Sequence, residues 1–400
     1  MNDIAVLTFH SVFNHDIARP WSFLSEPIIA FENTLKYLKK HKYETITLKE
    51  LYELKKDNIK DNKKRVVLNF DDGFLDNFTI VYPLLMKYGM KATVFVSPEF
   101  VDKRDIVRPL FDIDSKKAKK TPIYDLQNHW GYMSWKELKI INDSGIFDVQ
   151  CHANSHTWYY VSNVLKDIHY ENDNYYWLWW NKNIGKKPQW LTEYNEKEIP
   201  YGFPVFEYAK SLSGKRFFPY NEVIAYIESS YLSKKPTFND KKAFISFLSK
   251  ELDSKFGGDI GYYETDDEFE KRIKYELLDS KKTIEKELNK TIDFLAWPGG
   301  AVSELAINVA KEAGFLAFTS KEKHVNNTND NPSLIYRMGG WSGKKKNNKS
   351  SNVFEKLFIM MQLSRKAENK GLANRIINIF GNRHRKKHIK ECSNRGEKWE

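Results

Sequence analysis

Val66-Val-Leu-Asn-Phe-Asp-Asp-Gly-Phe-Leu-Asp76 is the stretch that decides the fold, because a short apolar run ends there in two adjacent carboxylates and a glycine. Successive side chains of a strand point to opposite faces, so Asp71 and Asp72 can enter one site only where the backbone turns, and Gly73 permits that turn. One carboxylate can then ligate a metal while the other stays available as a proton acceptor. The same Asp-Asp-Gly sequence is also typical of an ordinary turn that caps the next helix.

A second polar cluster, Asp148-Val-Gln-Cys-His-Ala-Asn-Ser-His156, follows an apolar run that begins at Gly145. Two imidazoles four residues apart can face one centre on a helical turn or a compact loop, and with a carboxylate they make a three-ligand metal site. The chain has ten histidines in 400 residues, so a pair at this spacing after a strand favours metal binding over chance. Cys151 is a further soft ligand in principle, although we expect a buried, inert thiol.

These elements resemble the polysaccharide deacetylases, also called carbohydrate esterase family 4 or the NodB homology domain. Asn69-Phe-Asp-Asp-Gly73 corresponds to the family's (T/S)FDDG motif, and His152-Ala-Asn-Ser-His156 corresponds to its H-x-x-x-H motif. Phe294-Leu-Ala-Trp-Pro-Gly-Gly300 is similar to the W-P-Y-G form of the third motif. Together with Leu7-Thr-Phe-His-Ser-Val12, that form points to the poly-N-acetylglucosamine deacetylase branch. The resemblance covers roughly residues 4–340 and is interrupted by a long insertion.

Seven apolar, β-rich runs recur along the chain and alternate with helical patterns, which predicts a parallel sheet in an α/β protein. Two helices carry capping-box signatures, Thr47-Leu-Lys-Glu50 and Ser134-Trp-Lys-Glu137, and a longer helix spans about Asp266 to Leu288. From the resemblance we expect a distorted (β/α)7 barrel with the motifs at the C-terminal strand ends, the face that carries the chemistry in such barrels. The runs are Ile4–Phe9, Val66–Phe70, Ala92–Val96, Phe147–Gln150, Phe294–Trp297, Leu316–Thr319 and Leu334–Met338.

The resemblance also implies a role for each site residue. Asp72, His152 and His156 would hold a divalent metal, with Zn²⁺ as the first choice, and Asp71 would accept a proton from the attacking water. The family often supplies a late histidine that protonates the leaving amine, and this chain has no clear counterpart. His10, at the end of the first predicted strand, is our substitute candidate for that role.

Two departures from the family pattern concern the third motif. The arginine that the R-x-P-x-(Y/F) form aims at the catalytic aspartate has no equivalent at Ala296 or Trp297, and the tyrosine of W-P-Y-G is Gly299. Arg337, on the last predicted strand, is expected to hold Asp71 ionised instead. An ordinary surface or core-rim ion pair is the alternative for that arginine.

Residues 157–262 interrupt the barrel pattern and contain five of the eleven tryptophans, at positions 158, 177, 179, 180 and 190. Aromatic faces stack on sugars and also fill cores, so we expect most of these rings to be buried in a small helical subdomain, which as a lid could shape substrate choice. Trp158, two residues after His156, is the best candidate for a substrate contact, together with Trp297 and Pro298 of the third motif.

Taken together, the motifs predict a metal-dependent N-deacetylase, a hydrolase that removes acetyl from an N-acetylated amino sugar in a surface polysaccharide or its lipid-linked precursor. Two alternatives stay open: a different metal-dependent amide hydrolase on the same barrel, and a catalytically weak glycan-binding pseudoenzyme. Metal analysis separates the pseudoenzyme from an enzyme. Product analysis separates the two hydrolases, because only the deacetylase releases acetate.

The positive charge of the chain is concentrated at its C-terminus. Residues 344–400 hold 16 Lys and Arg against 5 Glu, a net charge of +11 that equals that of the whole chain. Apolar positions at helical spacing among these charges fit an interfacial helix drawn to anionic lipid, and fit equally a helix packed on the domain before a solvated tail. No nucleic-acid motif accompanies the charge, so nucleic-acid binding ranks last.

The sequence shows neither an apolar run of about 20 residues nor a signal-peptide pattern, so we expect a cytoplasmic protein or one peripheral at the inner face of the membrane. Its two cysteines, Cys151 and Cys392, cannot build a disulfide framework. The expected organisation is a catalytic barrel over residues 1–343, with 157–262 as an inserted lid or subdomain, and a basic amphipathic helical tail over 344–400.

Overall fold

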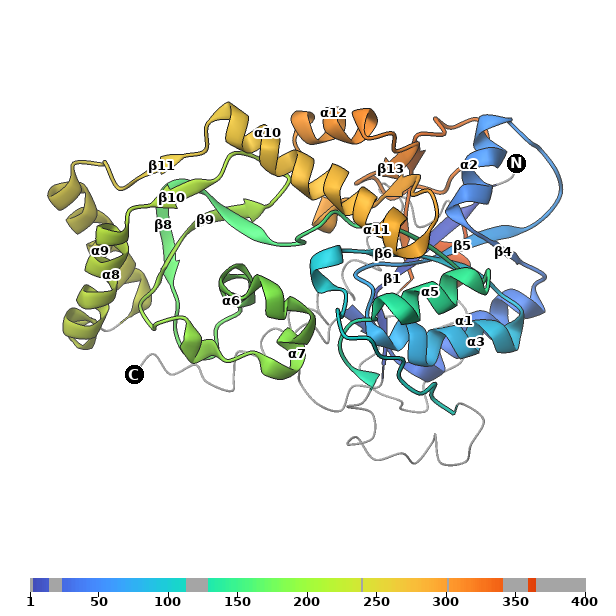
Figure 1. The fold of residues 1–400 in the computed structure, drawn as a ribbon, viewed down its shortest axis with the longest axis horizontal. Coiled ribbons are helices and arrows are strands. Elements are labelled where there is room, and N and C mark those ends of the chain that lie inside the picture. Colours follow the sequence, from blue (N-terminus) through green and yellow to red (C-terminus); the bar gives the residue numbers. More distant parts are fainter. Residues whose placement is uncertain are drawn as a thin grey trace.

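The computed structural model describes residues 3–13, 24–112, 129–238, 240–300, 302–340 and 359–364. Figure 1 shows two lobes side by side, a barrel lobe and a lobe built from residues 157–262, with one long helical run extending along both.

A parallel sheet forms the centre of the barrel lobe and contains all seven predicted strands. Its hydrogen-bonded order is β14-β13-β12-β7-β6-β5-β1-β15, and every pairing along it is parallel. The strands are β1 (Ala5–Phe9), β5 (Arg65–Phe70), β6 (Ala92–Val96), β7 (Phe147–Cys151), β12 (Phe294–Leu295), β13 (Ala317–Thr319), β14 (Leu334–Ile335) and β15 (Met338–Gly339). Nearly all their side chains are buried, as continuous apolar runs predict for a parallel sheet.

The two ends of this strand order, β14 and β15, are successive parts of one run of chain separated by Tyr336 and Arg337. β14 pairs with β13 and β15 pairs with β1, so the last predicted strand passes from one edge of the sheet to the other. The hydrogen-bond ladder is interrupted between them, which makes the barrel distorted. β4 (Glu44–Ile46) adds a parallel strand against the first half of β5, and β2 (Ser11–Val12) pairs with β3 (Ser25–Glu26) outside the main sheet.

Helices connect the strands and cover the sheet. They are α1 (Ile28–Lys40), α2 (Leu48–Lys56), α3 (Tyr82–Tyr88), α5 (Trp135–Asp143), α10 (Asp266–Lys274), α11 (Ser280–Leu288) and α12 (Glu304–Glu312), with short turns η2 (Asn77–Val81), η3 (Pro98–Phe100), η8 (Tyr275–Asp279) and η9 (Pro298–Gly300). Both predicted capping boxes are present, at Thr47 and Ser134. The predicted long helix is confirmed as α10, the π-helical turn η8 and α11 in one continuous run.

Side chains of β5 alternate between two cores. Leu68 and Phe70 belong to the large core under the helices, whereas Val67 belongs to a smaller cluster that β1, β5, β6, β12, β13 and β14 share, the interior of the barrel. The period of two therefore assigns Asn69 and Asp71 to the interior side as well. A polar pair at the C-terminal end of this side is what an active site at the barrel mouth requires.

The lobe of residues 157–262 has an aromatic core and contains two antiparallel strand pairs, β8–β9 and β10–β11, where the sequence predicted a helical subdomain. The strands are favoured because aromatic and β-branched residues make up most of β8 and recur in β9 as Val205, Phe206 and Tyr208. Trp177, Trp179, Trp180 and Trp190 are buried in this core, as expected. The elements are β8 (Trp158–Ile168), α6 (Tyr176–Lys182), η5 (Ile184–Gln189), α7 (Trp190–Glu193), η6 (Glu196–Glu198), β9 (Pro204–Lys210), β10 (Phe217–Pro219), α8 (Asn221–Lys234), η7 (Lys235–Thr237), α9 (Lys241–Phe256) and β11 (Gly261–Tyr263).

Most of the predicted basic tail, 344–400, lies outside the described residues. Within residues 359–364, Ile359 and Gln362 are buried and Leu363 packs against the large core. This short segment therefore packs on the domain, which is the second of the two interpretations given above. Among the described helices, we find none with the length and apolar character needed to cross a membrane.

Candidate metal centre

Asp72 and Gly73 turn the chain sharply at the end of β5. Their φ angles are +72° and +71°, and a Cβ on Gly73 would lie 2.9 Å from Val96 Cγ1. The sequence argument assigned this turn to the glycine alone. In the structure Asp72 shares the left-handed conformation, which aspartate tolerates better than most residues.

The two histidines follow β7 on a loop that is fixed to the end of β6. The His152 N–H donates to Val96 O at 2.8 Å, and His152 O accepts from Ser97 Oγ at 2.8 Å. His152 Nε2 lies 3.3 Å and His156 Nε2 lies 3.2 Å from Asp72 Oδ1. The three residues predicted as ligands are therefore brought together, with one donor atom of each lying within 4.8 Å of the others.

This set of donors has the chemistry of a cation site. His152 Nδ1 lies 2.8 Å from the carbonyl oxygen of Ala296, which can only accept, so Nδ1 carries the proton and Nε2 presents its lone pair to Asp72. Burial lowers the pKa of His156 to about 4, so this imidazole is neutral near pH 7. Both carboxylate oxygens of Asp72 are buried without a hydrogen-bond partner among the described residues. A carboxylate and two imidazoles that converge in this way fit a divalent metal.

Asp71 lies outside this set and is held by other partners. Arg337 Nη1 lies 2.8 Å from both carboxylate oxygens, Asn69 Nδ2 donates to Oδ1 at 2.9 Å, and His10 Nε2 lies 3.9 Å from Oδ2. Burial favours the neutral acid, but the Arg337 guanidinium beside the carboxylate outweighs it and lowers the pKa of Asp71. The predicted contact between Arg337 and Asp71 is present. It is not a surface ion pair, because the Asp71 side chain is 5% exposed.

A pocket opens beside the metal-ligand candidates, lined by Asp72, Ser97, Phe100, Tyr132, His156 and Trp180. The sequence analysis did not identify Ser97, Phe100 or Tyr132, and it counted Trp180 only as a core residue. The position of β6 could have indicated Ser97, which directly follows that strand, and Phe100, which ends the short turn η3 after it. Phe100 packs edge-on against the His156 ring at 6.2 Å between centroids, so it helps to orient that imidazole.

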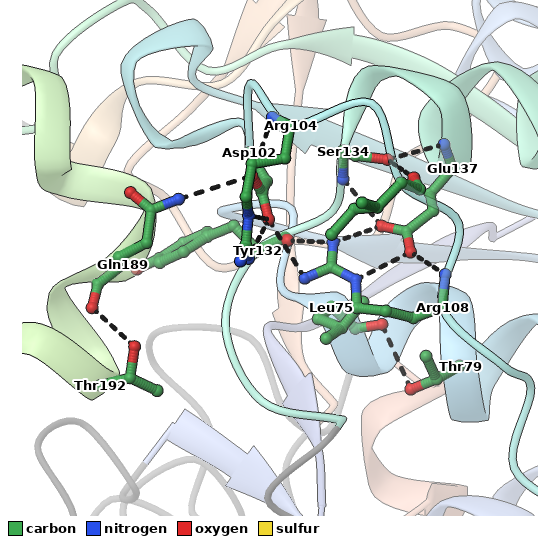
Figure 2. Close-up of polar contacts among 11 residues, drawn as sticks. Leu75, Thr79, Asp102, Arg104, Arg108, Tyr132, Ser134, Glu137, Gln189 and Thr192 are labelled. Atoms are coloured by element: carbon green, nitrogen blue, oxygen red, sulfur yellow. Dashed lines mark hydrogen bonds and ion pairs between the residues drawn. The ribbon is translucent and has the colours of Figure 1, made fainter.

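Tyr132 is held in the pocket wall by a polar network behind it (Figure 2). Its hydroxyl accepts from Trp190 Nε1 at 2.9 Å, and its carbonyl oxygen accepts from Arg108 Nη2 at 2.8 Å. Arg108 also pairs with the fully buried Glu137, at 2.5 Å between Nη2 and Oε2, and Nη1 lies 3.3 Å from Asp102 Oδ2. The network therefore ties the pocket wall to helix α5 on one side and to the 157–262 lobe on the other.

The 157–262 lobe also brings Trp158 and Lys210 to the site. The Trp158 ring packs edge-on against His156, at 6.1 Å between centroids, and Lys210 Nζ lies 3.3 Å from the Trp158 ring centroid. A Cβ on Gly299 would overlap the Lys210 side chain. Gly299 stands where the W-P-Y-G form has tyrosine, so the missing side chain leaves room for Lys210, which the sequence analysis did not identify.

Trp297 and Pro298, predicted to contact substrate, are not among the residues that line the pocket. Trp297 is 3% exposed and packs against Phe318 at 5.4 Å between ring centroids. A substrate contact for these two residues stays a prediction, and burial leaves the Trp297 ring without an open face for a sugar. Cys151 is buried, and burial raises its pKa to about 12, in accord with the inert thiol expected.

Comparisons of sequence identify relatives over part of the chain. Residues 58–196 match the family model described as polysaccharide deacetylase. YxkH of Bacillus subtilis (strain 168), whose name assigns it to the polysaccharide deacetylases, is 37% identical over 93 residues, which are 23% of this chain and 31% of that protein. The poly-β-1,6-N-acetyl-D-glucosamine N-deacetylase of Staphylococcus aureus (strain MSSA476) is 34% identical over 103 residues, 25% of this chain and 34% of that protein. The chain thus matches about a third of the length of these relatives.

Comparisons of structure extend the likeness to most of the chain. The de-N-acetylase from Aggregatibacter actinomycetemcomitans superposes with a TM-score of 0.52 at 15% identity, covering 88% of this chain and 99% of that one. The deacetylase domain of BpsB from Bordetella bronchiseptica gives a TM-score of 0.50 at 16% identity, covering 84% and 95%. At these identities the likeness concerns the fold alone. The resemblance drawn from the motifs is thereby confirmed: residues 58–196 match the polysaccharide deacetylase model, and the fold is similar to that of solved deacetylases.

Proposed function

We propose that the chain is a metal-dependent N-deacetylase that removes acetyl from an N-acetylated amino sugar of a surface polysaccharide or its lipid-linked precursor. The observation that carries the proposal is the convergence of Asp72, His152 and His156 next to an ionised Asp71 that does not belong to the ligand set. Zn²⁺ is the proposed metal, because two imidazoles and one carboxylate with an open position are typical of catalytic zinc. The poly-N-acetylglucosamine deacetylase among the relatives supports the class of substrate.

The residues of the chain divide the work of amide hydrolysis. A divalent cation bound by the three ligands would lower the pKa of a water molecule and polarise the acetamide carbonyl. Asp71 accepts the proton of the attacking water, and Arg337 with Asn69 keeps its carboxylate ionised and oriented. His10, beside Asp71, is the proposed donor of the proton that the leaving amine takes up. Acetate and a free amino sugar are the products.

Acetate release from defined glycans tests the proposal. The full chain is loaded with Zn²⁺ and incubated with β-1,6- and β-1,4-linked N-acetylglucosamine oligomers, N-acetylgalactosamine glycans and lipid-linked acetamido sugars. We expect equal amounts of acetate and free amine, loss of both on chelation, and recovery when metal is returned. Amide cleavage without acetate would favour the other metal hydrolase. Glycan binding by a chain that retains no metal would favour the pseudoenzyme.

Replacing Arg337 by Gln is expected to move the acidic limb of the kcat/KM profile to higher pH by about 1 unit or more. The guanidinium lowers the pKa of Asp71, so its removal raises that pKa and the ionised base is lost at a higher pH. The measurement is kcat/KM for acetate release against pH, because this ratio reports the free enzyme. Arg337→Lys, which keeps the charge, should shift the limb less. An unchanged limb in both variants would contradict the assignment of Asp71 as base.

We also propose that residues 344–400 hold the enzyme at anionic membranes, where lipid-linked sugars are found. Because residues 359–364 pack on the domain, the test variant leaves them unchanged. It replaces by Gln only the basic cluster further along the sequence, Arg383, Arg385, Lys386 and Lys387. The parent chain should sediment with anionic liposomes at low salt and be released at high salt, as surface electrostatics requires. The variant should bind less while keeping its activity on a soluble glycan. Equal sedimentation of the two proteins would exclude this role.

A further inference from the structure

The loop between the two candidate histidine ligands has a backbone that must be held in place. Ala153 has a φ angle of +56° and His156 a φ angle of +44°, in the left-handed region that is unfavourable for non-glycine residues. Such conformations persist only where the surroundings determine them. The residues between the ligands, Asn154 and Ser155, are buried, so their polar groups need partners inside the protein.

The Glu276 carboxylate, from a distant part of the chain, accepts three hydrogen bonds from these polar groups. Its Oε2 accepts from the N–H groups of Asn154 at 3.1 Å and Ser155 at 2.9 Å, and its Oε1 accepts from Ser155 Oγ. Glu276 is fully buried and lies in the π-helical turn η8, inside the long helical run. Turns of this kind are often found at functional sites, because the extra residue changes the direction of the neighbouring side chains.

Lys187 holds the same loop from the opposite direction and comes from the 157–262 lobe. Its Nζ donates to Ser155 O at 2.9 Å and to Glu99 Oε2 at 2.5 Å, and the residue is 1% exposed. Glu99 also accepts from Tyr275 Oη at 2.7 Å, next to Glu276 in η8. The backbone N–H of Glu99 donates to Asn154 O at 3.2 Å, which completes the ring of contacts around the loop.

The segment that carries Lys187 is itself docked on the barrel. Gln189 Nε2 lies 3.4 Å from Asp102 Oδ1, as Figure 2 shows, and Trp190 Nε1 donates to the Tyr132 hydroxyl. Two independent anchors therefore keep η5 in position while Lys187 reaches beneath the ligand loop. A lid that opened at this point would have to leave Glu99 without its buried cation, at considerable cost.

We propose that Glu276 and Lys187 are positioning residues that hold the His152–His156 loop in its ligating conformation. Through Lys187, the 157–262 lobe is then a structural part of the metal centre, and it does not open as a lid at this point. The inference rests on the proposed metal function and deepens it. Both side chains act through the loop, by hydrogen bonds to its backbone and, for Glu276, also to the Ser155 hydroxyl, and neither belongs to the proposed ligand set. Loss of such outer partners typically reduces metal affinity by 10- to 100-fold.

Zn²⁺ affinity of the folded full chain tests the proposal. Glu276→Gln and Lys187→Met are each titrated with Zn²⁺ against a chromophoric chelator, and thermal unfolding is followed with and without the metal. We expect a Kd at least about 10-fold weaker in each variant, with a smaller rise in Tm on adding Zn²⁺. Where a variant fails to fold, Ser155→Ala replaces it in the test. This change removes only the hydroxyl contact with Glu276 and should also weaken Zn²⁺ binding.

Glu264→Gln is the matched control. Glu264 is also buried and also accepts three hydrogen bonds, from Arg216 N at 2.9 Å and from Arg272 Nε and Nη2 at 2.7 and 2.8 Å. This variant should lower the Tm of the metal-free protein and leave the Zn²⁺ Kd of the folded protein unchanged. Folded Glu276 and Lys187 variants that bind Zn²⁺ as tightly as the parent would overturn the inference while leaving the proposed function intact. A parent chain that binds no metal would instead overturn the proposed function.

Discussion

Replacement of His156 by Ala is expected to reduce bound zinc from about one ion per chain to none after desalting, and acetate release to background. Asp72 and His152 alone would leave two ligands, and structural and catalytic zinc sites use three or four. The vacated ring also removes the edge-on contact of Phe100 in the pocket wall. His152→Ala should behave in the same way, because that ring is the second nitrogen donor. The measurements are metal content by mass spectrometry and acetate release on the best substrate.

His169→Gln provides the matched control for both histidine variants. His169 is buried and its Nδ1 lies 2.6 Å from Asp173 Oδ2, so it forms a histidine–carboxylate pair that is not part of the candidate metal site. Its loss should lower the Tm of the protein without changing the metal content of the fraction that remains folded. Stoichiometric zinc in both the His152 and the His156 variants would remove the ligand assignment.

The sequence allowed the barrel to be predicted because each of its strands is a local signal. Buried parallel strands have to be apolar along their whole length, and all seven such runs became strands of the sheet. The two capping boxes could also be predicted, because each is formed by residues within four consecutive positions of the sequence. The motif residues could be placed for a related reason. Once strand ends are known, parallel strands bring residues 71, 72, 152 and 156 to one face of the barrel.

The 157–262 lobe could not be predicted to the same depth. Its aromatic residues were recognised as a core, but the antiparallel pair β8–β9 places Trp158 opposite Lys210. These residues lie too far apart in the sequence for a local pattern to indicate the pairing. Lys187 gave no signal either, because a lysine in a polar stretch is usually exposed. Only the folded chain shows that it is buried against Glu99. Trp297 shows the same limit: its motif suggested a substrate contact, which stays a prediction, and the motif did not show that the ring packs in the large core.

Replacement of Asp71 by Asn is expected to lower acetate turnover by about 100-fold or more while the chain keeps one zinc ion. Asn has nearly the same shape and keeps an oxygen for Arg337, but it cannot take a proton from water. The three proposed metal ligands do not include Asp71, so zinc content should match that of the parent chain.

Asp148→Asn is the control for charge and for folding in the same measurement. Asp148 lies near the start of β7, whereas His152 follows the end of that strand, and it pairs with Lys290 at 2.5 Å, so its neutralisation should leave turnover within a few-fold of the parent chain. Two results would contradict the role of Asp71. Loss of zinc in the Asn variant would make Asp71 a ligand. Turnover close to that of the parent chain, with zinc in place, would mean that another group takes the proton. His10 is then the first residue to replace, because its imidazole lies next to the same carboxylate.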